Sequence, residues 1–160
     1  MSAALQTSLR RTDICVSVLL RVTNSVLTEA FEARCHAIEA DRGKAPEVRT
    51  VYHGTSMASA EAIAAVGFDP MCSRIAAYGR GTYCSPAVKM ALGYCKDVRG
   101  REDFSMVFQC KFAAGLFTPT GSGEPIVGDY GGNGAHGNIL VTPYKDGILP
   151  EYLICYYSWA

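Results

Sequence analysis

The chain has 160 residues, of which 49% are hydrophobic and 19% are charged, with fifteen basic and fifteen acidic side chains. This length suits one domain, which buries roughly 70% of its unfolded surface when it folds. A formal net charge of zero argues against a dedicated DNA-binding protein, and no run reaches the ~18 apolar residues that a membrane-spanning helix needs.

The first half of the chain predicts a strand, a helix and a second strand. Apolar residues alternate over residues 14–20, which favours a half-buried strand over a signal peptide because no small-residue cleavage site follows. A helix should run from an N-cap among residues 23–25 to about Asp41 and stop near Gly43. Its apolar face is predicted to hold Leu27, Phe31, Cys35 and Ile38. A short strand is predicted over residues 49–53.

Two more helices are predicted in the middle of the chain, on either side of a short strand. The first begins near Ser56 and ends at Gly67 as a left-handed cap. Its packing residues are predicted to be Ala60, Ile63, Ala64 and Val66. A strand over residues 82–84 precedes the second, which starts at Ser85-Pro86 and runs to about Lys96.

The last third of the chain is predicted to be mostly strand. Strands are expected over residues 104–112, 138–142 and 152–158, with residues 143–150 as a connection. Helices therefore come early and strands late. This order predicts an α+β fold with a mostly antiparallel sheet rather than a doubly wound parallel sheet.

The cysteines and histidines do not have the spacing of a metal site. The seven cysteines are spread evenly without a Cys-x-x-Cys pair, and the three histidines lie far apart in the sequence. This pattern favours buried, reduced thiols in an intracellular protein, and no metal is expected.

Two short motifs are candidates for a functional site. His53-Gly54-Thr55 puts a glycine at a strand end, where a flat amide could approach the backbone while the imidazole and hydroxyl reach ribose hydroxyls. Gly79-Arg80-Gly81 leads into a strand that carries Tyr83, and Tyr94 follows in the next helix. The two phenol rings could enclose a planar ligand, and such stacking is worth about 0.5–1.5 kcal/mol. A structural histidine and two core tyrosines are the alternative.

Together these motifs resemble the signature of the poly(ADP-ribose) polymerase family of ADP-ribosyltransferases. The family's histidine-glycine-Ser/Thr motif is present as VYHGTS, and its glycine-x-glycine-x-tyrosine strand as YGRGTYCS. Its C-terminal Pro-Glu-Tyr-Leu-Ile motif ends at Ile154, and Gly67-Phe68-Asp69 and Val22-Thr23-Asn24 also match. The resemblance spans about residues 14–157. It implies a single catalytic domain over residues 1–160, with a mostly antiparallel core and a few flanking helices.

The resemblance also implies a binding site for NAD, which is the substrate in this family. The Gly54 backbone would hold the nicotinamide carboxamide, and Tyr83 and Tyr94 would stack on its ring. His53 and Thr55 would bind the adenosine-side ribose. Cleavage of the nicotinamide–ribose bond passes through an oxocarbenium-like state with a good leaving group, so positioning dominates catalysis.

Two positions depart from the family pattern. Ile139 stands thirteen residues before Tyr152, where polymerising members carry a glutamate. Isoleucine can neither accept a hydrogen bond from a ribose 2′-hydroxyl nor activate that hydroxyl, so the triad His53, Tyr83 and Ile139 resembles that of the mono-ADP-ribosylating members.

The second departure is Ala91, which stands where the family usually has a serine that bonds the carboxamide. Loss of this hydroxyl should weaken binding by roughly 0.5–1.5 kcal/mol, unless Ser85 or Cys84 compensates.

Other features leave their interpretation open. The glycine-rich stretch 121–137 is either a flexible connection or an acceptor-shaping loop that uses Glu124, Asp129 or His136. Arg74 and Arg80 either face the diphosphate or lie on the surface. About fifty residues precede His53, so no autoinhibitory helical subdomain is expected and access of NAD should be constitutive.

The sequence therefore predicts an NAD-dependent mono-ADP-ribosyltransferase that moves one ADP-ribose unit onto an acceptor protein and releases nicotinamide. No dependence on DNA, no membrane partner and an intracellular location are expected. One alternative is an NAD hydrolase, with water as the acceptor. The other is a degenerate module that binds NAD, ADP-ribose or a protein without catalysis. His53, Tyr83 and Tyr94 favour retained binding, whereas Ala91 and Ile139 favour lost chemistry.

Overall fold

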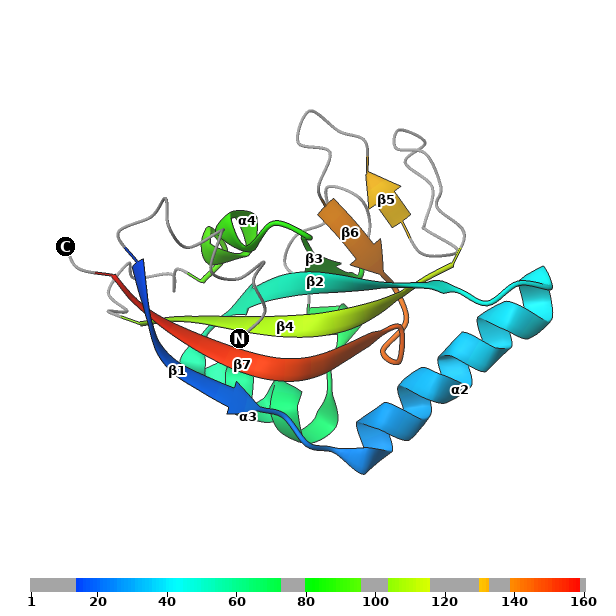
Figure 1. The fold of residues 1–160 in the computed structure, drawn as a ribbon, viewed down its shortest axis with the longest axis horizontal. Helices are drawn as coiled ribbons and strands as arrows, with labels where there is room; N and C mark the ends of the chain where they lie inside the picture. The colour runs from blue at the N-terminus through cyan, green and yellow to red at the C-terminus, as the bar shows by residue number, and fades with distance from the viewer. Residues whose placement is uncertain (1–13, 73–79, 96–103, 116–129, 133–138, 159–160) are drawn as a thin grey trace.

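A computed structural model describes residues 14–72, 80–95, 104–115, 130–132 and 139–158. In this part of the chain, strands form a four-stranded sheet of order β1-β7-β4-β2 and a three-stranded sheet of order β3-β6-β5 (Figure 1). The strands are β1 Ile14–Arg21, β2 Glu47–Thr55, β3 Thr82–Cys84, β4 Phe104–Ala114, β5 Tyr130–Gly132, β6 Ile139–Thr142 and β7 Ile148–Ser158. Neighbouring strands within each sheet are antiparallel, so the predicted α+β class is confirmed.

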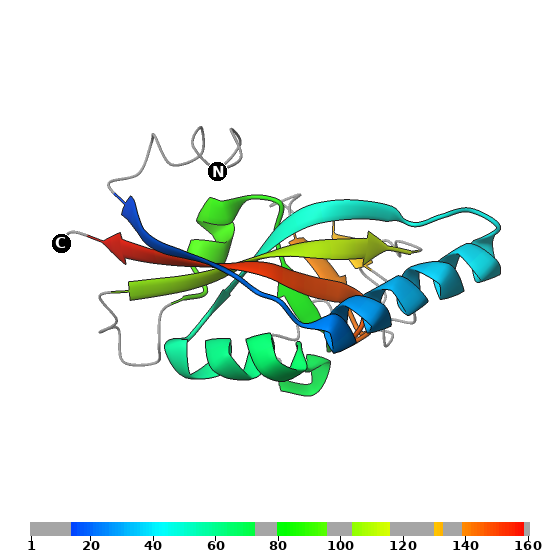
Figure 2. The same cartoon turned by 60° about the horizontal axis from the view of Figure 1, so that its bottom comes forward.

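Helices cover both faces of the four-stranded sheet. They are α2 Ser25–Arg42, α3 Met57–Val66 and α4 Val88–Leu92, with a 3₁₀ turn, η1, at Pro70–Cys72. Alternate residues of β4 divide the core: Phe108 and Cys110 pack with Ile63 of α3, whereas Val107 packs with Val88 of α4. Figure 2 shows α3 and α4 on opposite sides of this sheet. Among the described helices, none is long and apolar enough to cross a membrane.

Helix α2 has the capping residues and the apolar face that the sequence predicts. Asn24 is the N-cap, and its side chain accepts a hydrogen bond from Leu27 N–H at 3.2 Å. Gly43 ends the helix at a φ of 67°, a left-handed conformation that favours glycine. Phe31 and Ile38 of this helix form a buried cluster with Ala113 of β4 and Leu149 of β7. Leu27 and Cys35 of the helix pack against this cluster.

Helix α4 is shorter than predicted, because the residue expected to cap it belongs to a strand pairing. The main chain of Ser85 exchanges two hydrogen bonds with Tyr52, which keep it extended, and the helix begins only at Val88. The Ser85 hydroxyl instead accepts from Ala87 N–H at 3.0 Å. The helix ends at Leu92, well before the predicted end at Lys96, which lies outside the described residues.

Strand β7 is longer than predicted. Ile148 and Leu149 already pair with β4, so the connection from β6 is shorter than residues 143–150. Pro150 lies at a register shift of this pairing, where the missing N–H of a proline is tolerated. Strand β5 was not predicted, because its Tyr130–Gly132 sequence looks like loop; it pairs with β6.

Smaller corrections concern α3 and the thiols. Val66 was expected to pack but is 59% exposed, and Gly67 has a φ of 82° with an extended ψ of −174°, so it is not a left-handed helical cap. Ala60 and Ile63 are buried as predicted. Cys72 is exposed, whereas the free thiols Cys84, Cys95, Cys110 and Cys155 are buried as expected.

Asn24 should contribute more to stability than an ordinary N-cap, because it also ties α2 to α3. Its side-chain amide donates to Ala65 O at 2.9 Å and to Ala64 O at 3.2 Å. We expect Asn24→Ala to lower the free energy of unfolding by about 1–3 kcal/mol in urea titrations. Asn24→Asp keeps the cap acceptor but loses both donors, so its loss should be smaller. The control is the exposed neighbour Ser25, and equal losses for Asn24→Ala and Ser25→Ala would contradict this role.

Candidate active site

Two main-chain hydrogen bonds join the two sheets at the predicted motifs. Tyr52 N–H donates to Ser85 O at 2.7 Å, and Ser85 N–H donates to Tyr52 O at 2.9 Å. This antiparallel bridge sets β2, which carries His53, beside β3, which carries Tyr83. Motifs that are thirty residues apart in the sequence therefore become neighbours.

The imidazole of His53 has a defined proton position. Its Nδ1 lies 2.6 Å from the main-chain oxygen of Tyr83, and a carbonyl oxygen only accepts, so Nδ1 carries the hydrogen. Burial lowers the pKa of His53, and the hydrogen bond to Tyr83 opposes this only in part. The ring is therefore neutral near pH 7, and Nε2 is left as a hydrogen-bond acceptor.

Phe68 fixes the plane of the same ring. It meets His53 edge to face, with ring centroids 4.9 Å apart and planes at 74°, and it packs in turn against Phe108 of β4. The sequence identified Phe68 only as part of a Gly-Phe-Asp motif and gave it no contact. An aromatic residue two positions after the last residue of α3 was the available signal, but its partner depends on the tertiary fold.

Gly54 is required by close packing of the protein itself. A Cβ at this position would overlap the main-chain oxygen of Ala91 and lie 2.9 Å from Cys95 Sγ. Because α4 fills the space on this face of the strand, close packing within the protein is by itself a reason for glycine at this position. The N–H and C=O of Gly54 lie in the plane of the sheet instead. The N–H and C=O of Tyr52 both point to Ser85. Main-chain groups two residues apart in a strand point to the same edge, so the N–H and C=O of Gly54 are directed to this edge as well.

The two predicted stacking tyrosines come from segments that adjoin Gly54. Tyr83 is the middle residue of β3 and is half-buried. Tyr94 follows α4, is 47% exposed, and donates its N–H to Ala91 O at 3.1 Å. The Ala91 oxygen in turn packs on Gly54, so a single hydrogen bond connects the Tyr94 main chain to the residue that contacts β2.

The position that lacks the family serine lies in apolar surroundings. Ala91 is 2% exposed and belongs to a buried cluster. The other members of this cluster are Tyr52, Val88, Cys95, Val107, Ile154 and Tyr156. The two groups considered as substitutes are both engaged within the protein: the Ser85 hydroxyl bonds Ala87 N–H, and the Cys84 thiol donates to Leu140 O at 3.4 Å.

The remaining predicted residues are distributed around these strands. Ile139 begins β6 and is half-buried, and the next residue, Leu140, pairs with Cys84 of β3. Thr55 ends β2 and is 7% exposed. Arg80 is exposed and lies two residues before the start of β3. The predicted residues Arg74, Glu124, Asp129 and His136 lie outside the described residues.

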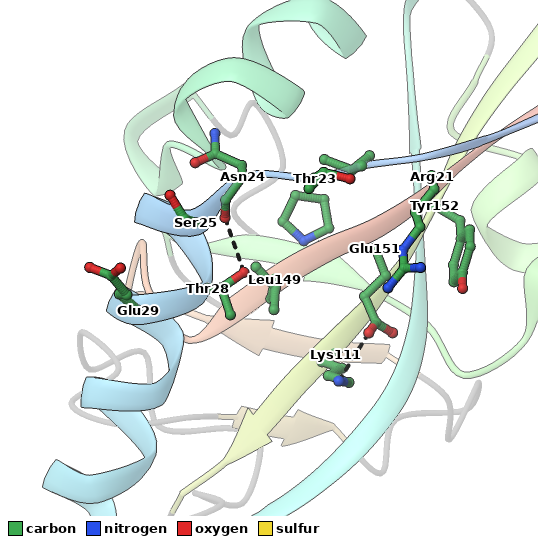
Figure 3. A pocket seen from close by; sticks show the side chains of 12 residues that line it. Arg21, Thr23, Asn24, Ser25, Thr28, Glu29, Lys111, Leu149, Glu151 and Tyr152 are labelled. Atoms are coloured by element: carbon green, nitrogen blue, oxygen red, sulfur yellow. Dashed lines mark hydrogen bonds and ion pairs between the residues drawn. The ribbon is translucent and has the colours of Figure 1, made fainter.

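A separate hollow of about 460 Å³ lies on the sheet at the first turn of α2 (Figure 3). It contains none of the predicted site residues. Its charged lining residues are Arg21, Glu29, Lys111 and Glu151, with Lys111 and Glu151 paired at 3.0 Å. Charges of both signs select no single class of ligand. Within the described ranges, no group of three or more His, Cys, Asp or Glu side chains is placed to hold a metal ion.

Comparison with known proteins assigns a family to most of the chain. Residues 3–117 match the family described as the poly(ADP-ribose) polymerase catalytic domain. The matched range includes His53, Gly54, Tyr83 and Tyr94, whereas Ile139 lies beyond it. No curated protein matches the chain.

The pKa of His53 makes the stability of the fold depend on pH. Because its folded-state pKa lies below the ordinary value of 6.5, the unfolded chain binds this proton more readily. The contribution of neutral His53 to the free energy of unfolding is complete above about pH 6.5. It is lost as the pH falls through 6.5 toward the lower folded-state pKa. Urea titrations at about pH 7.5 and pH 5.5 should show a smaller drop for His53→Gln than for the wild type. His36, exposed on α2, is the control; an identical drop for wild type, His53→Gln and His36→Gln would exclude this linkage.

Proposed function

The chain belongs to the poly(ADP-ribose) polymerase catalytic-domain family, and from this premise we propose that it is a mono-ADP-ribosyltransferase. Family membership supports NAD-dependent ADP-ribosyl transfer. The proposed reaction moves a single ADP-ribose unit from NAD to an acceptor protein side chain and releases nicotinamide. The observation that carries this proposal is the bridge between Tyr52 and Ser85, which brings His53, Gly54 and Tyr83 together.

Gly54 would hold the carboxamide of nicotinamide through its main chain. A carboxamide has one acceptor and one donor group, and the N–H and C=O of Gly54 are directed to the sheet edge as one donor and one acceptor. Tyr83 lies on β3 beside this edge, and Tyr94 follows α4, which packs on the face of Gly54. Both rings would stack on the nicotinamide ring.

His53 and Thr55 would bind the adenosine-side ribose. The hydrogen bond from Nδ1 to Tyr83 O leaves Nε2 as an acceptor, which suits a ribose hydroxyl donor. Lowering of the His53 pKa by burial supports this role, since a protonated ring would offer a second donor in place of the acceptor. Successive side chains of β2 project to opposite faces of the sheet. His53 and Thr55 are two residues apart, so they lie on the same face.

Catalysis would depend on positioning rather than on a reactive side chain. The nicotinamide–ribose bond breaks through an oxocarbenium-like state, and an enzyme that holds ring and ribose in place lowers the barrier to that state. Ile139 has no group that could bond the ribose 2′-hydroxyl or activate a bound hydroxyl for elongation. We therefore propose transfer of one unit without polymer formation.

One observation favours a second candidate, a degenerate module that binds NAD or ADP-ribose without catalysis. Ala91 lies in an apolar cluster, the Ser85 hydroxyl donates to Met90 Sδ at 3.6 Å, and the Cys84 thiol donates to Leu140 O, so none of the three offers the carboxamide a donor in this arrangement. Hydrolysis of NAD by water is the third alternative and would use the same residues. Neither DNA nor a membrane is proposed as a partner.

Incubation with NAD followed by intact-mass measurement tests these alternatives together. We expect single ADP-ribose additions to an acceptor, with release of one nicotinamide for each addition and no change on adding nicked DNA. Long polymer would overturn the proposed single transfer. Nicotinamide release without added mass would indicate a hydrolase, and the absence of both would indicate a binding module.

Tyr94 should affect binding of nicotinamide without affecting the fold, because its side chain is 47% exposed. We expect Tyr94→Ala to weaken binding of nicotinamide about three- to tenfold by calorimetry, as loss of one ring stack predicts, whereas Tyr94→Phe retains binding. Tyr144→Ala is a matched control, since that ring stacks on Arg34 of α2 at 3.3 Å. Equal affinities of the wild type and Tyr94→Ala for nicotinamide would show that Tyr94 does not take part in binding.

A further inference from the structure

We propose that Cys95 is a positioning residue that sets Tyr94 and α4 against Gly54; this inference rests on the proposed function. Cys95 is not among the residues that the sequence motifs identify. Its role follows from three contacts of its thiol and from the residue that precedes it.

Three segments meet at the sulfur of Cys95. The thiol donates to Met106 O of β4 at 3.1 Å, and it lies 3.5 Å from Ala91 O of α4. The sulfur is also 2.9 Å from the point where a side chain would begin at Gly54 of β2. Since Gly54 pairs with the neighbour of Met106 in β4, one atom links the helix to both strands beneath it.

Tyr94 and Cys95 have opposite environments. The Tyr94 side chain is 47% exposed, whereas Cys95 is 2% exposed and belongs to the buried cluster with Ala91 and Val107. The buried thiol thus fixes the main chain from which the exposed phenol ring projects. A shift of the thiol would move Tyr94 relative to the Gly54 edge.

Helix α4 depends on such tertiary contacts. It has only five residues and no side-chain cap at its N-terminus. Isolated helices shorter than about 12–15 residues are marginal in water, so packing determines where α4 lies. Val88 and Ala91 bury its inner face, and Cys95 holds the segment that follows its C-terminal end.

Sulfur suits this position in size as well as in hydrogen bonding. Removal of the thiol by Cys95→Ala loses the donor to Met106 O and leaves a space beside Gly54. Cys95→Ser keeps a donor, but its oxygen is smaller and its bond to Cβ is shorter. We therefore expect the alanine variant to have the larger effect and the serine variant an intermediate one.

A matched control lies in β4, on the side of the sheet that packs against α3. Cys110 is 0% exposed, lies in β4 with Met106, and packs in the cluster on the α3 side. Cys110→Ala removes the same atom from a similarly buried place, in the cluster that contains Ile63 of α3 rather than in the cluster that contains Cys95. It should lower stability while leaving the site unchanged.

The test measures two properties of the full chain: calorimetric affinity for nicotinamide and for NAD, and amide hydrogen exchange over residues 91–95 without ligand. We expect Cys95→Ala to weaken nicotinamide binding about tenfold, as for a displacement below 1 Å, and to speed exchange over these residues. Cys110→Ala should match the wild type in both. If Cys95→Ala does not fold, Cys95→Ser is compared with Cys110→Ser in the same way.

The outcomes separate this inference from the function on which it rests. Wild-type affinity and exchange in the Cys95 variants, or equal changes in the Cys110 variants, would overturn the positioning role alone. A wild-type chain that binds neither NAD nor nicotinamide would overturn the proposed function, and the role of Cys95 in it.

Discussion

The candidate site is built around one pair of main-chain hydrogen bonds, between Tyr52 and Ser85. These bonds hold the edge of the four-stranded sheet against β3 of the smaller sheet. One residue further along β2, the His53 ring bonds the Tyr83 carbonyl, so the imidazole also spans the two sheets. The bridge and this hydrogen bond together fix the histidine and glycine of one motif relative to the tyrosine of the other.

Main-chain groups provide much of this arrangement. The Tyr83 carbonyl sets the tautomer of His53, and the Ala91 carbonyl packs on Gly54. Side chains at Ala91 and Ile139 can therefore differ from the family pattern while the strands keep their positions. This separation of scaffold and chemistry is why family membership supports NAD-dependent transfer, whereas the number of ADP-ribose units transferred stays a proposal.

Burial explains why the same elements serve both stability and the site. The inner face of α4 packs on Val107 and Ile154, and its outer end leads to the exposed Tyr94. Burial lowers the pKa of His53 and so favours its neutral form, and Phe68, in the core cluster on the α3 side, meets its ring edge to face. A substitution in either cluster can therefore act on the candidate site from a distance.

The sequence alone determined the elements that local chemistry specifies. The N-cap among residues 23–25, the stop near Gly43 and the strand over residues 104–112 follow from the residues themselves, and the structure confirms them. Tertiary structure decided the start of α4, because Ser85 is a helix cap locally but is held extended by Tyr52. It also decided the reason for Gly54, the partner of Phe68 and the position of Cys95. Each of these depends on contacts between segments distant in the chain, which no local pattern of residues encodes.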